Sequence, residues 1–332
     1  MTNPATRVAK AFLSSRMGRS LLNAVVSSPI QAWLVTWMAR SGEGTDATLR
    51  RGSLPLPVHF YSPVPDLEDL ERRDVWSRRS ALAGIDFRPE VQVAYLLDLG
   101  SRFGRECGWS ADTSGDPSTF YSENTSFSFG CAAAAHCIIR DRKPKRVVEI
   151  GSGMSSIVIS AALKLNESDG AQPANHTIVD PYPSPRLDTL LGAPANVIAD
   201  RVEVLDITLF EHLDRGDILF IDSGHTVRIG GDVNFLVLDV LPRLRPGVIV
   251  HFHDIGLPYE YPKAYLTNPS FRVLWTESYL LQAFLACNRD FEVLLAMAYL
   301  THDHHESFEK AFPLYDPARH ASTSGSFWMA RR

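Results

Sequence analysis

An apolar run that ends in an acid and continues into two glycines is the feature that most constrains this chain. The acid is Glu149, and Gly151 and Gly153 follow it. Glycine adopts positive φ and carries no Cβ, so the backbone can turn sharply here and a ligand can lie directly against it. The pattern predicts a buried strand, a turn that binds a cofactor, and a helix with Ser155 and Ser156 as N-caps. Taken alone, the two glycines are also compatible with a plain strand-to-helix turn.

Four more apolar runs follow, and each ends in an aspartate. They cover residues 176–180, 202–206, 217–222 and 247–254, and the acids are Asp180, Asp206, Asp222 and Asp254. Continuous apolar strands separated by helices or loops are typical of a parallel sheet covered on both faces, with ligands beyond the carboxyl ends of the strands. We therefore expect these carboxylates at one edge of a sheet, with Asp180 on the ribose hydroxyls of a cofactor. Aspartate also caps helices and starts turns, so any single one of these acids could be only a helix cap or a turn residue.

Together these motifs resemble class I S-adenosylmethionine-dependent methyltransferases over about residues 131–332. Residues 291–299 and 326–330 resemble the sixth strand and the antiparallel seventh strand of that family. The resemblance implies an α/β fold with a Rossmann-like, doubly wound sheet of seven strands, mostly parallel with an antiparallel last strand. Residues 221–226 and 253–258 look most like a bacterial branch associated with sugar or polysaccharide modification.

The resemblance implies a binding site for S-adenosylmethionine at the ends of the strands. The residues expected at this cofactor are Glu149, Gly151, Ser152, Gly153, Ser155, Asp180, Asp206 and Asp222. The implied reaction is O-methylation of a small molecule, a sugar or a glycoconjugate.

Two other interpretations of the function stay open. One is an NAD(P)-dependent oxidoreductase on a similar sheet, which is disfavoured because Ser156 stands where the third glycine of that motif belongs. The other is a catalytically silent binding protein of the same fold.

A metal site is expected at the ends of the fourth and fifth strands. Methyl transfer to oxygen requires removal of a proton from a hydroxyl of high pKa, which a divalent ion can assist. Catechol-type methyltransferases use an acid after the fourth strand and an Asp-Asn pair after the fifth, and Asp222 and Asp254 match two of these positions. His253 stands where that family has a carboxylate. We expect Asp222, His253 and Asp254 to bind a divalent ion. The ion could be magnesium, but the imidazole favours a softer ion such as manganese, iron or zinc. The alternative is that the three residues form a metal-free acid-base cluster.

Histidines supply the expected acid-base chemistry. His225 lies three residues after Asp222, where the catechol-type enzymes have a lysine base. Its unperturbed pKa of about 6.5 suits proton removal near neutrality, so we expect His225 to be the general base and His253 a second catalytic residue. We expect His251 to be structural, and residues 302–305, which contain three histidines, to form a solvated loop.

Composition divides the chain into three parts. Residues 131–332 are expected to form the catalytic domain. Residues 56–130, rich in proline, aromatic and charged side chains, are expected to form a lid over the substrate. In that lid, Tyr121, Asn124 and Phe127 could form the floor of the acceptor pocket or serve only in packing.

Residues 1–55 form an extension with four basic residues ahead of a moderately apolar stretch, residues 21–39. Polar residues interrupt this stretch, so we expect an amphipathic helix instead of a signal peptide or a membrane span. The helix would pack on the body or lie at a membrane surface or a partner. The expected location is the cytoplasm, either free or peripheral to a membrane, and a homo-oligomer stays open.

Composition also narrows the class of partner. The chain has 332 residues, of which 45% are hydrophobic, enough for one large core and an appendage. The net charge is −5, and there is no basic stripe interleaved with aromatic residues, which argues against a nucleic-acid partner. The four cysteines form no CxxC pair and are expected to be reduced thiols. The expected partner is therefore a small-molecule or glycan acceptor.

Overall fold

The structure is a computed structural model that describes residues 28–116, 118–185, 187–191, 196–320 and 324–332. It divides into two compact units, Met1–Asp74 and Val75–Arg332. The predicted boundaries at residues 55 and 130 differ from this division, because the border lies between Asp74 and Val75.

The first unit contains α3 (Pro29–Ser41), α4 (Thr45–Leu49) and α5 (Leu67–Arg72). The Ser28 side chain accepts a hydrogen bond from the Gln31 amide at the start of α3, and Gly42 ends the helix with φ of 75°. No described side chain of α3 is buried. Part of the apolar stretch 21–39 lies outside the described residues. Within the described ranges, none of the helices is both long and apolar enough to cross a bilayer.

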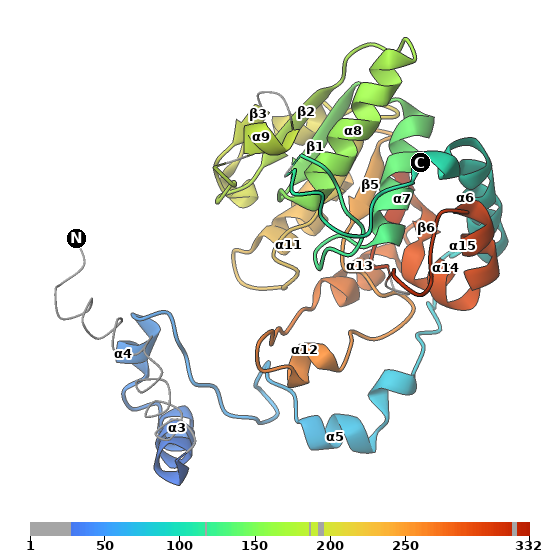
Figure 1. The fold of residues 1–332 in the computed structure, drawn as a ribbon. Coiled ribbons are helices and arrows are strands. Elements are labelled where there is room, and N and C mark those ends of the chain that lie inside the picture. Colours follow the sequence, from blue (N-terminus) through green and yellow to red (C-terminus); the bar gives the residue numbers. More distant parts are fainter. Residues whose placement is uncertain (1–27, 117, 186, 192–195, 321–323) are drawn as a thin grey trace. The chain divides into compact units, whose positions relative to one another are not determined.

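The second unit is built on a seven-stranded sheet (Figure 1). Its strands are β1 (Arg146–Ile150), β2 (Asn175–Val179), β3 (Asn196–Ile198), β4 (Ile218–Ile221), β5 (Ile249–Phe252), β6 (Phe291–Ala296) and β7 (Phe327–Arg331). The strand order is β3-β2-β1-β4-β5-β7-β6. The first five strands pair in parallel, and β7 runs antiparallel to both β5 and β6. The predicted Rossmann-like, mostly parallel sheet is therefore confirmed.

The described residues of the second unit also form helices. They are η1 (Val75–Ser77), α6 (Pro89–Phe103), η2 (Gly104–Glu106), α7 (Phe129–Arg142), α8 (Met154–Ser168), α9 (Leu187–Leu191), η3 (Val202–Val204), α10 (Thr208–Glu211), α11 (Asp232–Asn234), the π-helical η4 (Phe235–Val240), η5 (Leu241–Arg243), α12 (Ala264–Thr267), α13 (Glu277–Leu285), α14 (Met297–Asp303) and α15 (His305–Ala311). Four consecutive alanines of α7, residues 132–135, are fully buried, because their small side chains let the helix pack closely on its neighbours.

Part of the predicted lid belongs to the body of the second unit. Helix α6 packs on β6 and on α15. At the α15 contact the backbones approach so closely that a Cβ added at Gly100 would lie 2.5 Å from Ala311. Residues 89–103 are therefore held in the body of the second unit by helix packing.

Two predicted elements are wrong. The third strand is Asn196–Ile198, whereas the apolar run at 202–206 contains a turn of 3-10 helix, η3. Asp206 therefore does not end a strand. It is exposed, and its carboxylate accepts a hydrogen bond from the Thr208 amide at 2.9 Å just before α10, whose N-cap is Ile207. Residues 302–305 form the junction of α14 and α15 instead of a loop.

Candidate active site

The turn after β1 contains two glycines with different tasks. Gly151 has φ of 90°, and a Cβ there would lie 2.2 Å from the backbone oxygen of Asp222. Glycine is therefore required for the close approach of the β1 and β4 ends. Gly153 has φ of 158°, and a Cβ there would meet nothing within 4 Å. The space above Gly153 is open, which is what a ligand lying against the backbone needs.

Glu149 stabilises this turn from below. Its carboxylate is fully buried and accepts hydrogen bonds from Ser155 Oγ at 2.7 Å and Ser156 Oγ at 3.0 Å. Its other oxygen lies 2.8 Å from His176 Nε2. With these partners and no exposed surface, Glu149 positions the turn, and the cofactor contact predicted for it stays a prediction. Ser155 is also buried, and the cofactor contact predicted for it likewise stays a prediction.

The start of α8 also differs from the prediction. The N-cap residue is Gly153, and both serines lie inside the first turn. Ser156 Oγ accepts a hydrogen bond from the Gly153 amide at 3.1 Å. One serine hydroxyl thus links Glu149 to the backbone of the glycine turn and fixes its shape.

Asp180 follows β2 and lies next to the glycine turn. Its side chain accepts hydrogen bonds from Ser152 Oγ and, at 2.8 Å, from the Tyr182 amide. Asp180 is partly exposed, and the Tyr182 ring beside it is almost fully exposed. Because β1 and β2 are neighbours in parallel register, the open glycine and this carboxylate lie at one edge of the sheet.

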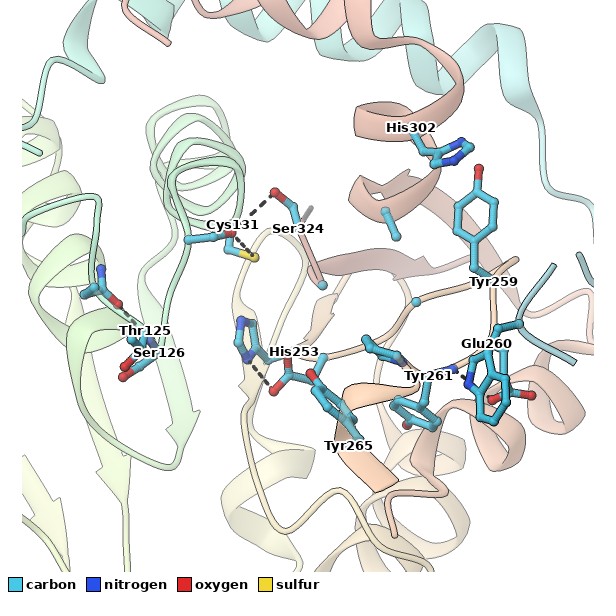
Figure 2. A pocket seen from close by; sticks show the side chains of 18 residues that line it. Thr125, Ser126, Cys131, His253, Tyr259, Glu260, Tyr261, Tyr265, His302 and Ser324 are labelled. Atoms are coloured by element: carbon cyan, nitrogen blue, oxygen red, sulfur yellow. Dashed lines mark hydrogen bonds and ion pairs between the residues drawn. The ribbon is translucent and has the colours of Figure 1, made fainter. Parts of the chain in front are cut away.

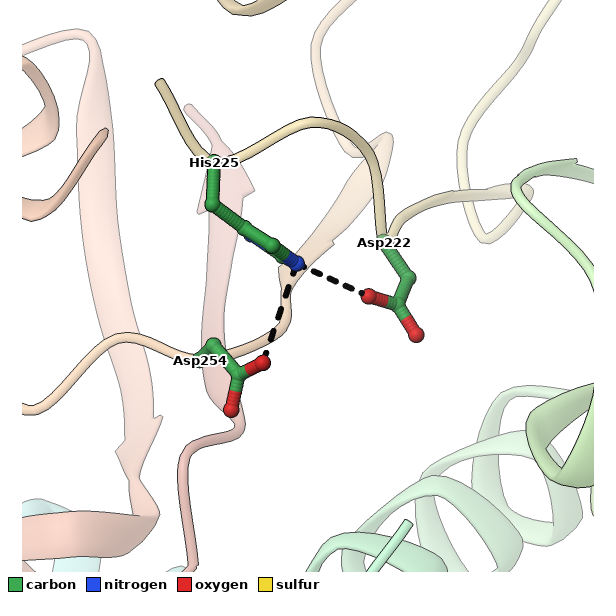
Figure 3. A group of neighbouring side chains, drawn as sticks. All are labelled: Asp222, His225 and Asp254. Atoms are coloured by element: carbon green, nitrogen blue, oxygen red, sulfur yellow. Dashed lines mark ion pairs between the residues drawn. The ribbon is translucent and has the colours of Figure 1, made fainter. Parts of the chain in front are cut away.

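Three polar side chains meet beyond β4 and β5 (Figure 3). His225 Nε2 lies 3.3 Å from Asp222 Oδ1 and 3.7 Å from Asp254 Oδ2. One ligand atom from each of the three residues lies within 4.8 Å of the other two. Two carboxylates and an imidazole at this spacing are able to bind one divalent ion.

The backbone at this cluster is strained, and neighbouring segments hold it in place. His225 and Asp254 have φ of 53° and 56°, a left-handed conformation that costs a non-glycine residue on the order of 1–3 kcal/mol. The His225 carbonyl accepts hydrogen bonds from the Thr276 and Glu277 amides at 2.9 and 3.1 Å. A Cβ added at Gly325 would lie 2.8 Å from Asp254 Cα, so the segment before β7 holds Asp254 from behind. The surrounding fold thus keeps both residues in this conformation.

Glu277 holds the His225 ring. Its Oε2 lies 2.8 Å from His225 Nδ1, and only 1% of the residue is exposed. A carboxylate on Nδ1 keeps the proton of a neutral imidazole there and leaves Nε2 free to bind an ion or a proton. The sequence analysis missed Glu277, because 52 residues separate it from His225 and no local motif marks it.

Electrostatic coupling within the cluster is strong. Burial alone lowers the pKa of His225, but hydrogen bonds to Asp222 and Glu277 and their negative charges outweigh it and raise the pKa to about 10. Burial likewise raises the pKa of Asp222, yet the neighbouring imidazoles of His253 and His225 hold that pKa well below its usual value. The carboxylates therefore favour positive charge between them, as a proton or as a cation.

His253 lies on the other side of the two carboxylates. Its Nδ1 is 3.4 Å from Asp222 Oδ1 and 3.4 Å from Asp254 Oδ2, and the ring is buried against Phe127 with centroids 5.3 Å apart. The structure therefore brings together all four residues predicted for metal binding and acid-base chemistry. His251 is separate: its Nε2 lies 2.9 Å from Ser326 Oγ, and its ring stacks on Phe220.

A cavity of about 680 Å³ opens beside the cluster, since Asp254 belongs to both. Figure 2 shows the side chains that line it. His253 and Asp254 form part of its wall. The other lining residues are Trp76, Asn124, Thr125, Ser126, Ser128, Cys131, Gly256, Tyr259, Glu260, Tyr261, Pro262, Tyr265, Ala298, His302, Ser324 and Gly325. Its wall combines aromatic rings with a few polar groups, as small-molecule sites commonly do.

Several residues singled out in the sequence lie at or near this cavity. Of the residues that could form the floor of the acceptor pocket or serve in packing, Asn124 lines the cavity, whereas Phe127 is buried behind His253. His302, expected in a solvated loop, also lines the cavity, with Nδ1 2.7 Å from Asp303 Oδ1. The rings of Tyr261 and Tyr265, which lie between β5 and α13, were not predicted at all.

Comparison with known proteins gives two similarities. A family model described as a methyltransferase domain matches residues 148–255. That segment holds the glycine turn, Asp180, Asp222, His225 and Asp254. An uncharacterized protein of Archaeoglobus fulgidus is 30% identical over 187 residues, which cover 52% of this chain and 79% of that relative.

Proposed function

The chain belongs to the class I S-adenosylmethionine-dependent methyltransferase family, and from this premise we propose that it methylates a hydroxyl group of a small-molecule or sugar acceptor with the help of a divalent metal ion. The observation that carries the proposal is the cluster of Asp222, His225 and Asp254, which adjoins the glycine turn through Asp222 and the aromatic cavity through Asp254. The family supports methyl transfer, and the cluster and cavity support the acceptor chemistry.

The cofactor is assigned to the ends of β1 and β2. The open space above Gly153 accommodates a ligand against the backbone, and Asp180 offers a carboxylate for the two ribose hydroxyls. Ser152 lies within hydrogen-bond reach of the same carboxylate and completes this polar edge. Asp206 is left out of the cofactor site because it is exposed and does not end a strand.

The ion is assigned to Asp222, His225 and Asp254. The donor set fits a divalent metal because both carboxylate groups and the imidazole Nε2 converge, and because Glu277 on Nδ1 leaves Nε2 free. An imidazole ligand favours manganese, iron or zinc over magnesium. When bound, such an ion lowers the pKa of an acceptor hydroxyl and orients it.

The acceptor is assigned to the aromatic cavity. Asp254 belongs both to the cluster and to the cavity wall, so an acceptor in the cavity reaches the cluster directly. Tyr261 and Tyr265 provide ring faces, while Asn124 and Glu260 provide hydrogen-bonding groups. This mixture suits a ring compound with several hydroxyl groups, such as a sugar.

The residues of the chain then have defined tasks. In the transfer, the methyl carbon leaves the sulfonium sulfur and bonds to the acceptor oxygen, and the hydroxyl proton must go to a protein group. His225, predicted to be the general base, is occupied as a ligand in this arrangement. We assign the proton to His253, which lines the cavity and is not one of the three assigned ligands. Its Nδ1 lies 3.4 Å from Asp254 Oδ2.

Calorimetric titration of the purified chain tests the proposal. S-adenosylmethionine and S-adenosylhomocysteine should bind at micromolar affinity, NAD(P)H should not bind, and manganese or zinc should bind to metal-free protein. The Asp254→Ala variant should lose turnover by orders of magnitude and keep cofactor affinity, whereas Asp206→Ala should keep both. Activity that is insensitive to chelators, with no ion bound, would refute the metal assignment, and absence of cofactor binding would refute the function.

A further inference from the structure

Helix α3 of the first unit presents an apolar stripe to solvent. Ile30, Trp33, Leu34 and Trp37 recur at the spacing of one helix face, and their exposed fractions are 77%, 65%, 44% and 39%. The two indole rings stack with centroids 6.5 Å apart. Globular proteins rarely leave such a contiguous apolar face uncovered unless it binds something.

The charge around this helix has the opposite sign to the rest of the chain. Residues 1–55 contain seven Lys or Arg and two Asp or Glu, a net charge of +5. The whole chain carries −5, so residues 56–332 carry −10. Four of the seven basic residues lie before residue 28, outside the described part, and Arg40, Arg50 and Arg51 lie in or near the helices of the first unit. Such asymmetry indicates an anionic partner for the extension.

We propose that α3 binds to the surface of an anionic membrane, with Trp33 and Trp37 at the level of the lipid headgroups. Tryptophan is enriched at this depth because its ring is apolar and its N–H is polar. Nearby basic residues add attraction of roughly 1 kcal/mol each to a negatively charged leaflet. With 13 residues, α3 is too short to span a bilayer, which takes about 20 residues, so it would lie in the interface. This proposal is independent of the methyltransferase assignment.

The test is binding of the full 332-residue chain to lipid vesicles. The chain should sediment with vesicles of phosphatidylglycerol and phosphatidylcholine, bind less as salt increases, and bind weakly to phosphatidylcholine alone. A Trp33→Ser/Trp37→Ser variant should bind at least tenfold more weakly. Its helix should persist, because neither indole is buried and serine and tryptophan have similar helix propensities.

Phe60→Ser/Tyr61→Ser provides the matched control. These two aromatic residues of the same unit are 92% and 87% exposed and contact each other edge to face, but they lie outside α3. This variant should bind vesicles as the wild type does. Arg50→Gln/Arg51→Gln should weaken binding at low salt only.

Three outcomes would overturn the proposal. They are failure of the wild type to bind anionic vesicles, equal binding by the Trp33→Ser/Trp37→Ser variant, and equal losses in that variant and the Phe60→Ser/Tyr61→Ser control. Self-association that the tryptophan variant abolishes, without vesicle binding, would assign α3 to a second copy of the chain instead. Circular dichroism of each variant shows whether α3 and the sheet have kept their structure.

Discussion

Replacing Glu277 by glutamine removes one charge from behind the candidate metal site and keeps the shape of the side chain. In the wild type, Glu277 Oε2 accepts from His225 Nδ1 at 2.8 Å in a fully buried setting. A charge-assisted hydrogen bond of this kind contributes roughly 1.5–3 kcal/mol, which corresponds to about 10- to 150-fold in a binding constant. Loss of a carboxylate behind a histidine ligand is expected to weaken metal binding by about 10- to 100-fold. We therefore expect Glu277→Gln to bind manganese or zinc at least tenfold more weakly.

Titration of metal-free protein with each ion, followed by calorimetry, measures this change. Affinity for S-adenosylhomocysteine should stay the same, because Glu277 contacts His225 and not the glycine turn. Glu292→Gln is a suitable control, since Glu292 lies on β6, away from the cluster, and pairs with Arg88. Unchanged metal affinity in a folded Glu277→Gln protein would refute the role of Glu277 as a positioning residue.

Three further substitutions test the cofactor site by titration with S-adenosylhomocysteine. Asp180→Ala should weaken binding at least tenfold, because it removes charge-assisted hydrogen bonds to the ribose. The control Asp200→Ala, after β3, should leave the affinity unchanged. Equal affinities of the Asp180→Ala variant and the wild type would disprove the assignment of the second strand end. Gly153→Val should abolish binding, since a branched side chain fills the open space and disfavours φ of 158°, and circular dichroism should show a folded protein; normal binding would make this turn purely structural. Gly151→Ala should instead lower the melting temperature, because its Cβ would collide with the Asp222 carbonyl oxygen at 2.2 Å, and an unchanged melting temperature would contradict this packing.

Short-range patterns in the sequence were sufficient to predict most of the sheet. The apolar runs that precede Asp180, Asp222 and Asp254 are strands, because continuous apolar segments of this length need burial on both faces. The strand predicted at residues 202–206 was wrong, since the alternation of valine and glutamate there also fits a half-buried 3-10 turn. The true third strand, Asn196–Ile198, has only three residues and no periodic signal.

The site was predictable only as far as it lies on strand ends. Asp222, His225, His253 and Asp254 meet because β4 and β5 are neighbours, which the strand pattern implied. Glu277 and the rings of Tyr261 and Tyr265 lie on segments whose paths depend on tertiary packing, and their local sequence carries no motif. The burial of Glu149 was also hidden, because an acid at a strand end gives no indication of which partners surround it.

The position of β7 between β5 and β6 has a consequence for synthesis on the ribosome. In the part of the chain that the structure describes, β6 pairs only with β7, which is made about thirty residues later. Until Phe327–Arg331 emerges, β5 presents an open edge and β6 has no neighbour to join. Gly325, just ahead of β7, supports Asp254, so the geometry of the cluster of Asp222, His225 and Asp254 is complete only once this segment has been inserted. During that interval β5 has an unpaired edge, and such an edge is prone to pair with another molecule.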